Sequence, residues 1–208
     1  MLELVLVFCA LAVYALLPSK LKKIFWVNLA ILLPAGIWII HSQATAGYSL
    51  IQIGIRTDNW SANWLGILIF SLTLAFIMFI IGAIREKLKW NKNMTISLFL
   101  YPLWGCAQQF LILSYINIRL VGFGLPPMII ALITGLAFMS LHVPDKWLMP
   151  ATLLLGFCFS LFFQQEPNLL LLGISHGWLG ILYYYWVIGK DPIAEKFSKP
   201  KTLNTLPA

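Results

Sequence analysis

Residues 63–84 read NWLGILIFSLTLAFIMFIIGAI and contain no charged side chain. A helix of this length rises about 30 Å, which matches the hydrocarbon thickness of a bilayer, so the stretch predicts a membrane-spanning helix. The composition of the whole chain agrees with this prediction. Of its 208 residues, 61% are hydrophobic and only 10% are charged, and the mean hydropathy is +0.88. A soluble domain carries about a quarter charged residues, so the composition excludes an ordinary soluble protein.

Six further apolar runs surround this stretch, and turn-forming residues separate them. Together they predict an all-α, polytopic membrane bundle of about seven transmembrane helices. The predicted spans lie at about 2–17, 24–41, 63–84, 96–118, 126–142, 147–163 and 168–188. The runs at 2–17 and 126–142 are short, so they need tilt or a thinner bilayer to cross it.

The formal charge of +7 follows this predicted topology. Only Arg56 and Arg119 fall on one side of a seven-span arrangement. The other twelve basic residues fall on the opposite side: Lys20, Lys22, Lys23, Arg85, Lys87, Lys89, Lys92, Lys146, Lys190, Lys196, Lys199 and Lys201. The positive-inside rule therefore predicts a plasma-membrane protein with its N-terminus outside and its C-terminus in the cytoplasm. Membrane lipid is an expected partner of these charges, and nucleic acid is not.

The chain divides into three parts along its length. Residues 1–62 are expected to form two helices and an interfacial loop, residues 63–188 a helical core, and residues 189–208 a basic cytoplasmic tail. The loop, at 42–62, is the longest polar connection and carries Tyr48 and Trp60, which suit the membrane interface. It is either an amphipathic segment on the bilayer surface or a plain connection with aromatic anchors.

Polar side chains inside the predicted spans are few, and they carry the functional argument. They include Gln108 and Gln109 in the fourth span, His142 at the end of the fifth and His176 within the seventh. No Asp or Glu lies deep in any predicted span, which disfavours a proton-coupled or sodium-coupled transporter. Structural roles are an alternative for the first three. The two amides can hydrogen-bond between helices, and His142 can cap the carbonyls of a last helical turn.

The imidazoles of His142 and His176 can bind Zn²⁺, but a catalytic zinc site usually has three protein ligands. Amide oxygens of Gln are weak ligands for such a metal, and the three cysteines show no Cys-x-x-Cys spacing. The sequence therefore does not indicate zinc or another divalent metal as a cofactor.

Three short patterns follow one another along the second half of the chain. They are Gln108-Gln109 with Leu113 four residues later, Phe138 with His142 four residues later, and His176 with Gly180 four residues later. Their order and spacing resemble the CAAX prenyl protease and bacteriocin-processing family, also called Abi-type membrane proteases. The motifs of that family are Glu-Glu-x-x-x-Arg, Phe-x-x-x-His and His-x-x-x-Asn. The resemblance covers residues 96–188 and implies a helical intramembrane endopeptidase with a polar cavity.

In that family a Glu activates water, and two His stabilise the oxyanion or hold a metal. Phe138, His142 and His176 match the family pattern, but Gln108 and Gln109 replace the glutamates. An amide cannot accept a proton near neutral pH, so whether the chain is an enzyme stays open.

One expectation is an endopeptidase acting on peptides or prenylated C-terminal tails. In that enzyme, His176 takes the proton of water while Gln108 and His142 orient the carbonyl. The alternative is a non-catalytic membrane scaffold or binding protein that holds a partner in the same cavity.

Overall fold

The computed structural model describes residues 2–18, 21 and 25–197, and helices are the only regular elements among them. In chain order they are α1 (Leu2–Leu16), α3 (Phe25–Thr45), α4 (Trp60–Ile84), α5 (Lys92–Gln109), η1 (Phe110–Asn117), α6 (Ile118–Gly122), α7 (Pro127–Ser140), α8 (Leu148–Gln165), α9 (Leu169–Leu182), η2 (Tyr183–Ile188) and α10 (Pro192–Phe197). Each predicted apolar run forms a helix, so the all-α fold class is confirmed. The two η elements are π-helical continuations of α5 and α9.

Four helical stretches are long and apolar enough to cross a membrane: Trp64–Ile84, Lys92–Gly122, Leu148–Gln165 and Leu169–Ile188. Helices α1 and α7 are apolar but shorter. Large apolar side chains lie open on the surface of α4, where Phe76 is 63% exposed and Leu72 is 58% exposed. An apolar surface of this kind suits lipid rather than water, so the fold is compatible with a membrane protein of several spans.

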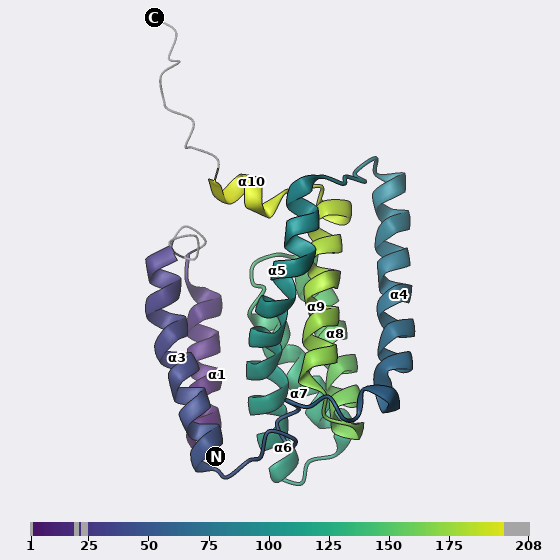
Figure 1. The fold of residues 1–208 in the computed structure, drawn as a ribbon. Helices are drawn as coiled ribbons and strands as arrows, with labels where there is room; N and C mark the ends of the chain where they lie inside the picture. Colours follow the sequence, from purple (N-terminus) through teal and green to yellow (C-terminus); the bar gives the residue numbers. More distant parts are fainter. Residues whose placement is uncertain (1, 19–20, 22–24, 198–208) are drawn as a thin grey trace, which may run out of the picture.

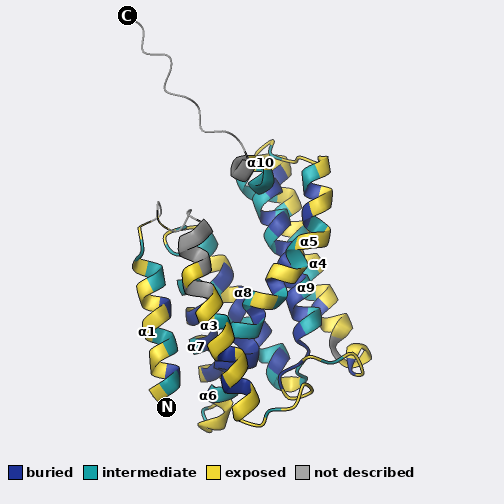
Figure 2. Ribbon diagram, turned by 60° about the vertical axis from the view of Figure 1, so that its left-hand side comes forward, coloured by how far each residue is buried: buried dark blue, intermediate teal, exposed yellow. Residues whose placement is uncertain are grey.

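Figure 1 shows how the helices are arranged. Helices α5, α7, α8 and α9 form the centre, α4 lies on one side, and the α1–α3 pair lies on the other. The most extensive contacts are those of α7 with α8 and of α5 with α9, and α4 packs on α9 and η2. The buried residues of Figure 2 accordingly gather on the helices of the centre.

Glycines set the close approach of α5 and α9. A Cβ atom added to Gly105 would lie 2.3 Å from the carbonyl oxygen of Gly173. One added to Gly177 would lie 2.6 Å from Cα of Pro102. No side chain fits at these points, because the two backbones are in direct contact.

A polar cluster, here called the Arg119 cluster, joins the α1–α3 pair to the centre. Arg119 donates from Nε to Glu3 at 3.4 Å, from Nη2 to Ser42 at 2.5 Å and from Nη1 to Gln43. Its guanidinium carbon also lies 4.0 Å from the ring centroid of Tyr115. The cluster therefore links α1, α3, η1 and α6 through one side chain.

The segment between α3 and α4 contains turns and no helix over residues 46–59. It folds inward at Ile53, whose carbonyl accepts a hydrogen bond from Oγ of Ser114 at 2.5 Å. The next residue, Gly54, accepts from the backbone N–H of Leu169 at 2.8 Å and has a φ of +81°. The middle of this loop therefore packs against η1 and the start of α9.

The loop after α4 and the end of η2 meet at the opposite end of the molecule from α6 (Figure 1). Basic side chains of this loop donate to the last carbonyls of the helix, an arrangement that favours a helix C-terminus. The pairs are Arg85 with Val187, Lys87 with Ile188 and Lys89 with Gly189.

Several basic residues of the predicted topology fall outside this description. Lys20, Lys22, Lys23, Lys199 and Lys201 lie outside the described residues, as does the side chain of Lys196. Of the predicted tail, 189–208, the structure describes residues 189–197, which include α10.

Candidate functional site

Three of the four predicted site residues lie together between α5, α7 and α9. Gln109 is the last residue of α5, His176 lies in the middle of α9, and His142 follows α7 by two residues. Gln109 has no exposed surface and His176 is 5% exposed. Nε2 of Gln109 donates to Nδ1 of His176 over 3.1 Å. His176 therefore has an amide of the neighbouring helix as its partner.

Phe138 brings the two imidazoles together. Its ring meets the ring of His142 edge to face at 5.0 Å between centroids, and that of His176 at 4.9 Å. The centroids of the two imidazoles are consequently no more than about 10 Å apart. Helix α7 has only 14 residues, and His142 lies in the turn directly after it.

The hydrogen bonds of the two rings determine which nitrogens carry protons. Nδ1 of His142 lies 2.9 Å from the carbonyl oxygen of Phe138, which can only accept, so Nδ1 carries the proton. Nε2 of neutral His142 is then a free base. In His176, Nδ1 lies beside Nε2 of Gln109, and the backbone carbonyl of Gly105 also accepts a hydrogen bond from the ring. His142 thus offers a free acceptor nitrogen, and His176 is held by two groups of α5.

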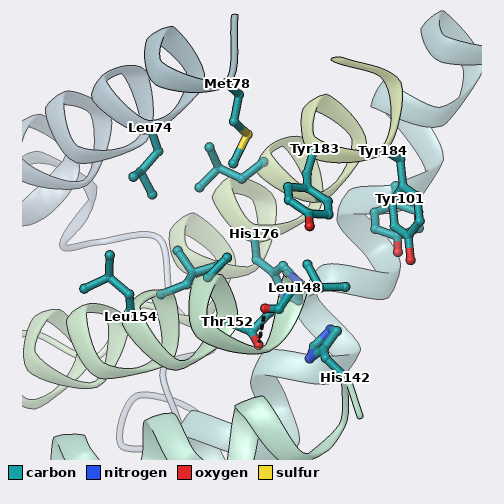
Figure 3. Close-up of a pocket in the computed structure, with 14 residues that line it drawn as sticks. Leu74, Met78, Tyr101, His142, Leu148, Thr152, Leu154, His176, Tyr183 and Tyr184 are labelled. Carbon is teal, nitrogen blue, oxygen red and sulfur yellow. Dashed lines mark hydrogen bonds between the residues drawn. The ribbon is translucent and has the colours of Figure 1, made fainter. Parts of the chain in front are cut away.

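Both imidazoles line a cavity of about 130 Å³, called here the His cavity. Figure 3 shows them beside the tyrosines of α5 and η2. Most of the remaining wall is apolar, including Leu148 and Leu179. Oη of Tyr183 is buried and has no hydrogen-bond partner among the described residues. It is a second polar group able to donate to a ligand in this cavity.

Sequence reasoning did not identify Tyr183, although a signal for it exists. It lies seven residues after His176, which is about two helical turns and so places both on one face. Tyr101 and Tyr184 also line the His cavity, and neither was predicted. An aromatic residue near the end of a predicted span is expected at the membrane interface, and this expectation hides a role inside the protein.

Gln108 does not share the His cavity. It lines a second cavity of about 330 Å³, called here the α3–α5 cavity, together with Ile39 and Ile40 of α3 and Leu111 of η1. Adjacent residues of a helix point about 100° apart, so Gln108 and Gln109 face different neighbours of α5. Of the four predicted site residues, His142 and His176 line the His cavity, Gln108 lines the α3–α5 cavity, and Gln109 lines neither but is buried against His176.

The donor set of the His cavity does not fit a catalytic metal ion. No group of three or more His, Cys, Asp and Glu side chains gathers anywhere in the described part of the chain. Each imidazole also has one nitrogen engaged, His142 with Phe138 and His176 with Gln109. Two neutral nitrogens without a carboxylate or thiolate are too few to hold Zn²⁺ at a site of the usual kind.

Comparisons with known proteins add nothing to the geometry of the site. No protein-family model, no curated protein and no solved structure matches this chain.

Proposed function

We propose that this chain is an intramembrane endopeptidase similar to the CAAX proteases, acting on peptides embedded in or anchored to the membrane, such as prenylated C-terminal tails. The observation that carries the proposal is the pair of imidazoles around Phe138: His142 has a free acceptor nitrogen, and His176 has an N–H in a ring that Gln109 and the carbonyl of Gly105 hold in place. These are the two groups that hydrolysis of a peptide bond requires. The spacing of Phe138, His142 and His176 supports the family resemblance.

The reaction uses His142 as the general base, which exchanges the roles expected from the sequence. Nε2 of His142 accepts a proton from water, and the water oxygen forms a bond to the carbonyl carbon of the substrate. Nε2–H of His176 and the hydroxyl of Tyr183 donate to the carbonyl oxygen as it gains negative charge. The C–N bond then breaks, and the protonated His142 returns the proton to the leaving nitrogen.

Gln109 is a positioning residue in this mechanism, because its amide is engaged with His176. Gln108 lies outside the reaction, because it lines the other cavity. In this mechanism, a base from the turn after α7 replaces the paired glutamates of the family pattern.

The proposed membrane arrangement has seven spans. To the four long apolar stretches it adds α3, which has 21 residues, and the shorter α1 and α7, which cross where the bilayer thins locally. The end that carries the 85–91 loop and Lys190 faces the cytoplasm of a plasma membrane, with the N-terminus outside. Arg56 and Arg119, at the other end, are each paired with an acid, Asp58 and Glu3.

A non-catalytic binding protein is the second candidate, and one observation favours it. The amide nearest to His176 replaces a carboxylate of the family pattern, and a general base contributes about 10²–10⁴-fold to a rate. A protein without that carboxylate can still hold a peptide with the same donor and acceptor groups. Partners of such a receptor would be membrane proteins with apolar or lipid-modified tails.

A cleavage assay on the detergent-purified protein separates the two candidates. The substrates are a fluorogenic peptide library that includes prenylated C-terminal peptides. The variants are His142→Ala and His176→Ala, with His41→Ala as the matched control, since His41 is exposed near the end of α3. Cleavage that is lost in the first two and kept in the control supports the enzyme. Binding without any cleavage by the wild type supports the receptor.

A further inference from the structure

Two pairs of adjacent residues separate the His cavity from the α3–α5 cavity. Gln109 holds His176 on one side of α5, and Gln108 lines the cavity on the other side. In the turn after α7, His142 lines the His cavity while Leu141 lines the α3–α5 cavity. Adjacent Cα atoms are about 3.8 Å apart, so the two cavities are separated at these points by the width of one chain segment.

The α3–α5 cavity is the larger of the two, at about 330 Å³ against about 130 Å³. Its walls are mainly apolar and come from α1, α3, α5 and η1, with Ile40 and Phe110 among them. An apolar chain would therefore find more room here than beside the imidazoles.

The side chain of Gln108 indicates whether a hydrocarbon tail or a peptide occupies this cavity. Its amide can donate two hydrogen bonds and accept two, yet it has no hydrogen-bond partner among the described residues. A hydrocarbon tail would leave these groups unmet, which is unfavourable in an apolar cavity. A peptide group offers one N–H and one C=O, and so matches the amide. In a membrane helix those backbone groups are already paired, so the occupant must be extended where it passes Gln108.

We propose that the α3–α5 cavity binds an extended apolar peptide segment that continues past Leu141 into the His cavity. The proposal rests on the proposed function and names its substrate class: a membrane-embedded polypeptide with an unwound apolar stretch, recognised through its backbone by Gln108. The α3–α5 cavity holds the apolar stretch, and the His cavity holds the peptide bond that is cut.

Gly36 offers a way to fill the α3–α5 cavity without disturbing the helix. It lines the cavity, and a Cβ atom added to it would meet nothing within 4 Å. Gly36→Phe therefore places a ring in the space reserved for the peptide. Ile37, the next residue of α3, is 60% exposed and gives the matched control Ile37→Phe.

Binding is measured in the full chain carrying His142→Ala, so that the result does not depend on cleavage. The two probes are a short fluorescent peptide of Leu and Ala residues and fluorescent palmitate. We expect Gly36→Phe to raise the Kd of the peptide by about tenfold or more, and Ile37→Phe to leave it within about twofold. Gln108→Leu should raise the Kd of the peptide by about threefold to tenfold and leave that of palmitate unchanged.

Two results would overturn the proposal. Peptide binding that ignores Gly36→Phe would place the peptide elsewhere. Binding of both probes that falls with Gly36→Phe but ignores Gln108→Leu would make the cavity a hydrocarbon site. If the wild type cleaves no peptide while the expected binding pattern holds, the endopeptidase fails and the peptide site stands.

Discussion

Nε2 of Gln109 donates a hydrogen bond of 3.1 Å to Nδ1 of His176, and both side chains are buried where α5 and α9 meet. The bond fixes the imidazole in one orientation and one protonated form. Since Oε1 of the same amide has no partner in the described structure, Gln109 contributes little to stability beyond this bond.

Gln109→Leu should therefore lower kcat by about 10²-fold while KM and the melting temperature change little, because a misplaced donor affects mainly the transition state. Steady-state kinetics and thermal unfolding on the same samples check this. Gln165→Leu, at an exposed position near the end of α8, is the control. An unchanged kcat in Gln109→Leu would remove Gln109 from the mechanism.

Gly177→Ala should destabilise the protein by about 1–3 kcal/mol, because the new Cβ would lie 2.6 Å from the backbone of Pro102 and would force α5 and α9 apart. Gly122→Ala is the matched change, since a Cβ there meets nothing within 4 Å. Circular dichroism during heating in detergent compares the two. Equal melting temperatures would mean that the two helices do not touch at Gly177.

Arg119→Lys should destabilise the protein although it keeps the charge. The guanidinium donates to three side chains of α1 and α3 and lies over Tyr115, and an ammonium group cannot reproduce this fork. The expected loss is about 1–3 kcal/mol, and Arg56→Lys should cost less, because its partner Asp58 is exposed. Unfolding in denaturant measures both, and similar losses would argue against the Arg119 cluster.

Asp191 gives a pH dependence to the contact between the loop at 85–91 and α10. Partial burial alone would raise the pKa of this carboxyl. Hydrogen bonds from the backbone N–H of Ala194 and from Asn93 and Asn91 have the larger, opposite effect, and the pKa is lowered to about 2. The pKa of an Asp side chain in an unfolded chain is about 3.9, so the carboxylate stabilises the contact above that pH. This stabilisation is lost as the pH falls from about 4 towards 2.

The hydrogen-exchange protection factor of the Ala194 amide should therefore decrease over that pH range. Asp191→Asn keeps an acceptor but does not titrate, so its protection should stay flat. A decrease of the same size in both proteins would show that another group is responsible.

The helices could be predicted from the sequence because a charge-free run such as 63–84 has few ways to fold in a membrane. The separation of Gln108 from Gln109 also follows from helical geometry, but which amide faces His176 does not. That choice depends on the rotation of α5, which the contacts of Gly105 and Gly177 with their neighbours set in three dimensions.

Other features of the site have no marker in the sequence that fixes them. The π-helical turns η1 and η2 follow directly from α5 and α9, and no residue in the sequence marks where the change begins. The bond of His142 to the carbonyl of Phe138 is the helix cap that the sequence offered as an alternative, but the nitrogen that this bond leaves free follows only from the position where α7 ends. The proposed exchange of base and donor between His142 and His176 therefore depends on the structure.

Chemical rescue of His142→Ala is the strictest test of His142 as the general base. The variant is assayed with the best peptide substrate of the wild type, with and without added imidazole, beside His176→Ala and His41→Ala. If His142 is the base, cleavage is lost in His142→Ala and returns in proportion to the imidazole added, while His41→Ala cleaves like the wild type. Cleavage that persists in His142→Ala without imidazole would contradict a mechanism based on this residue.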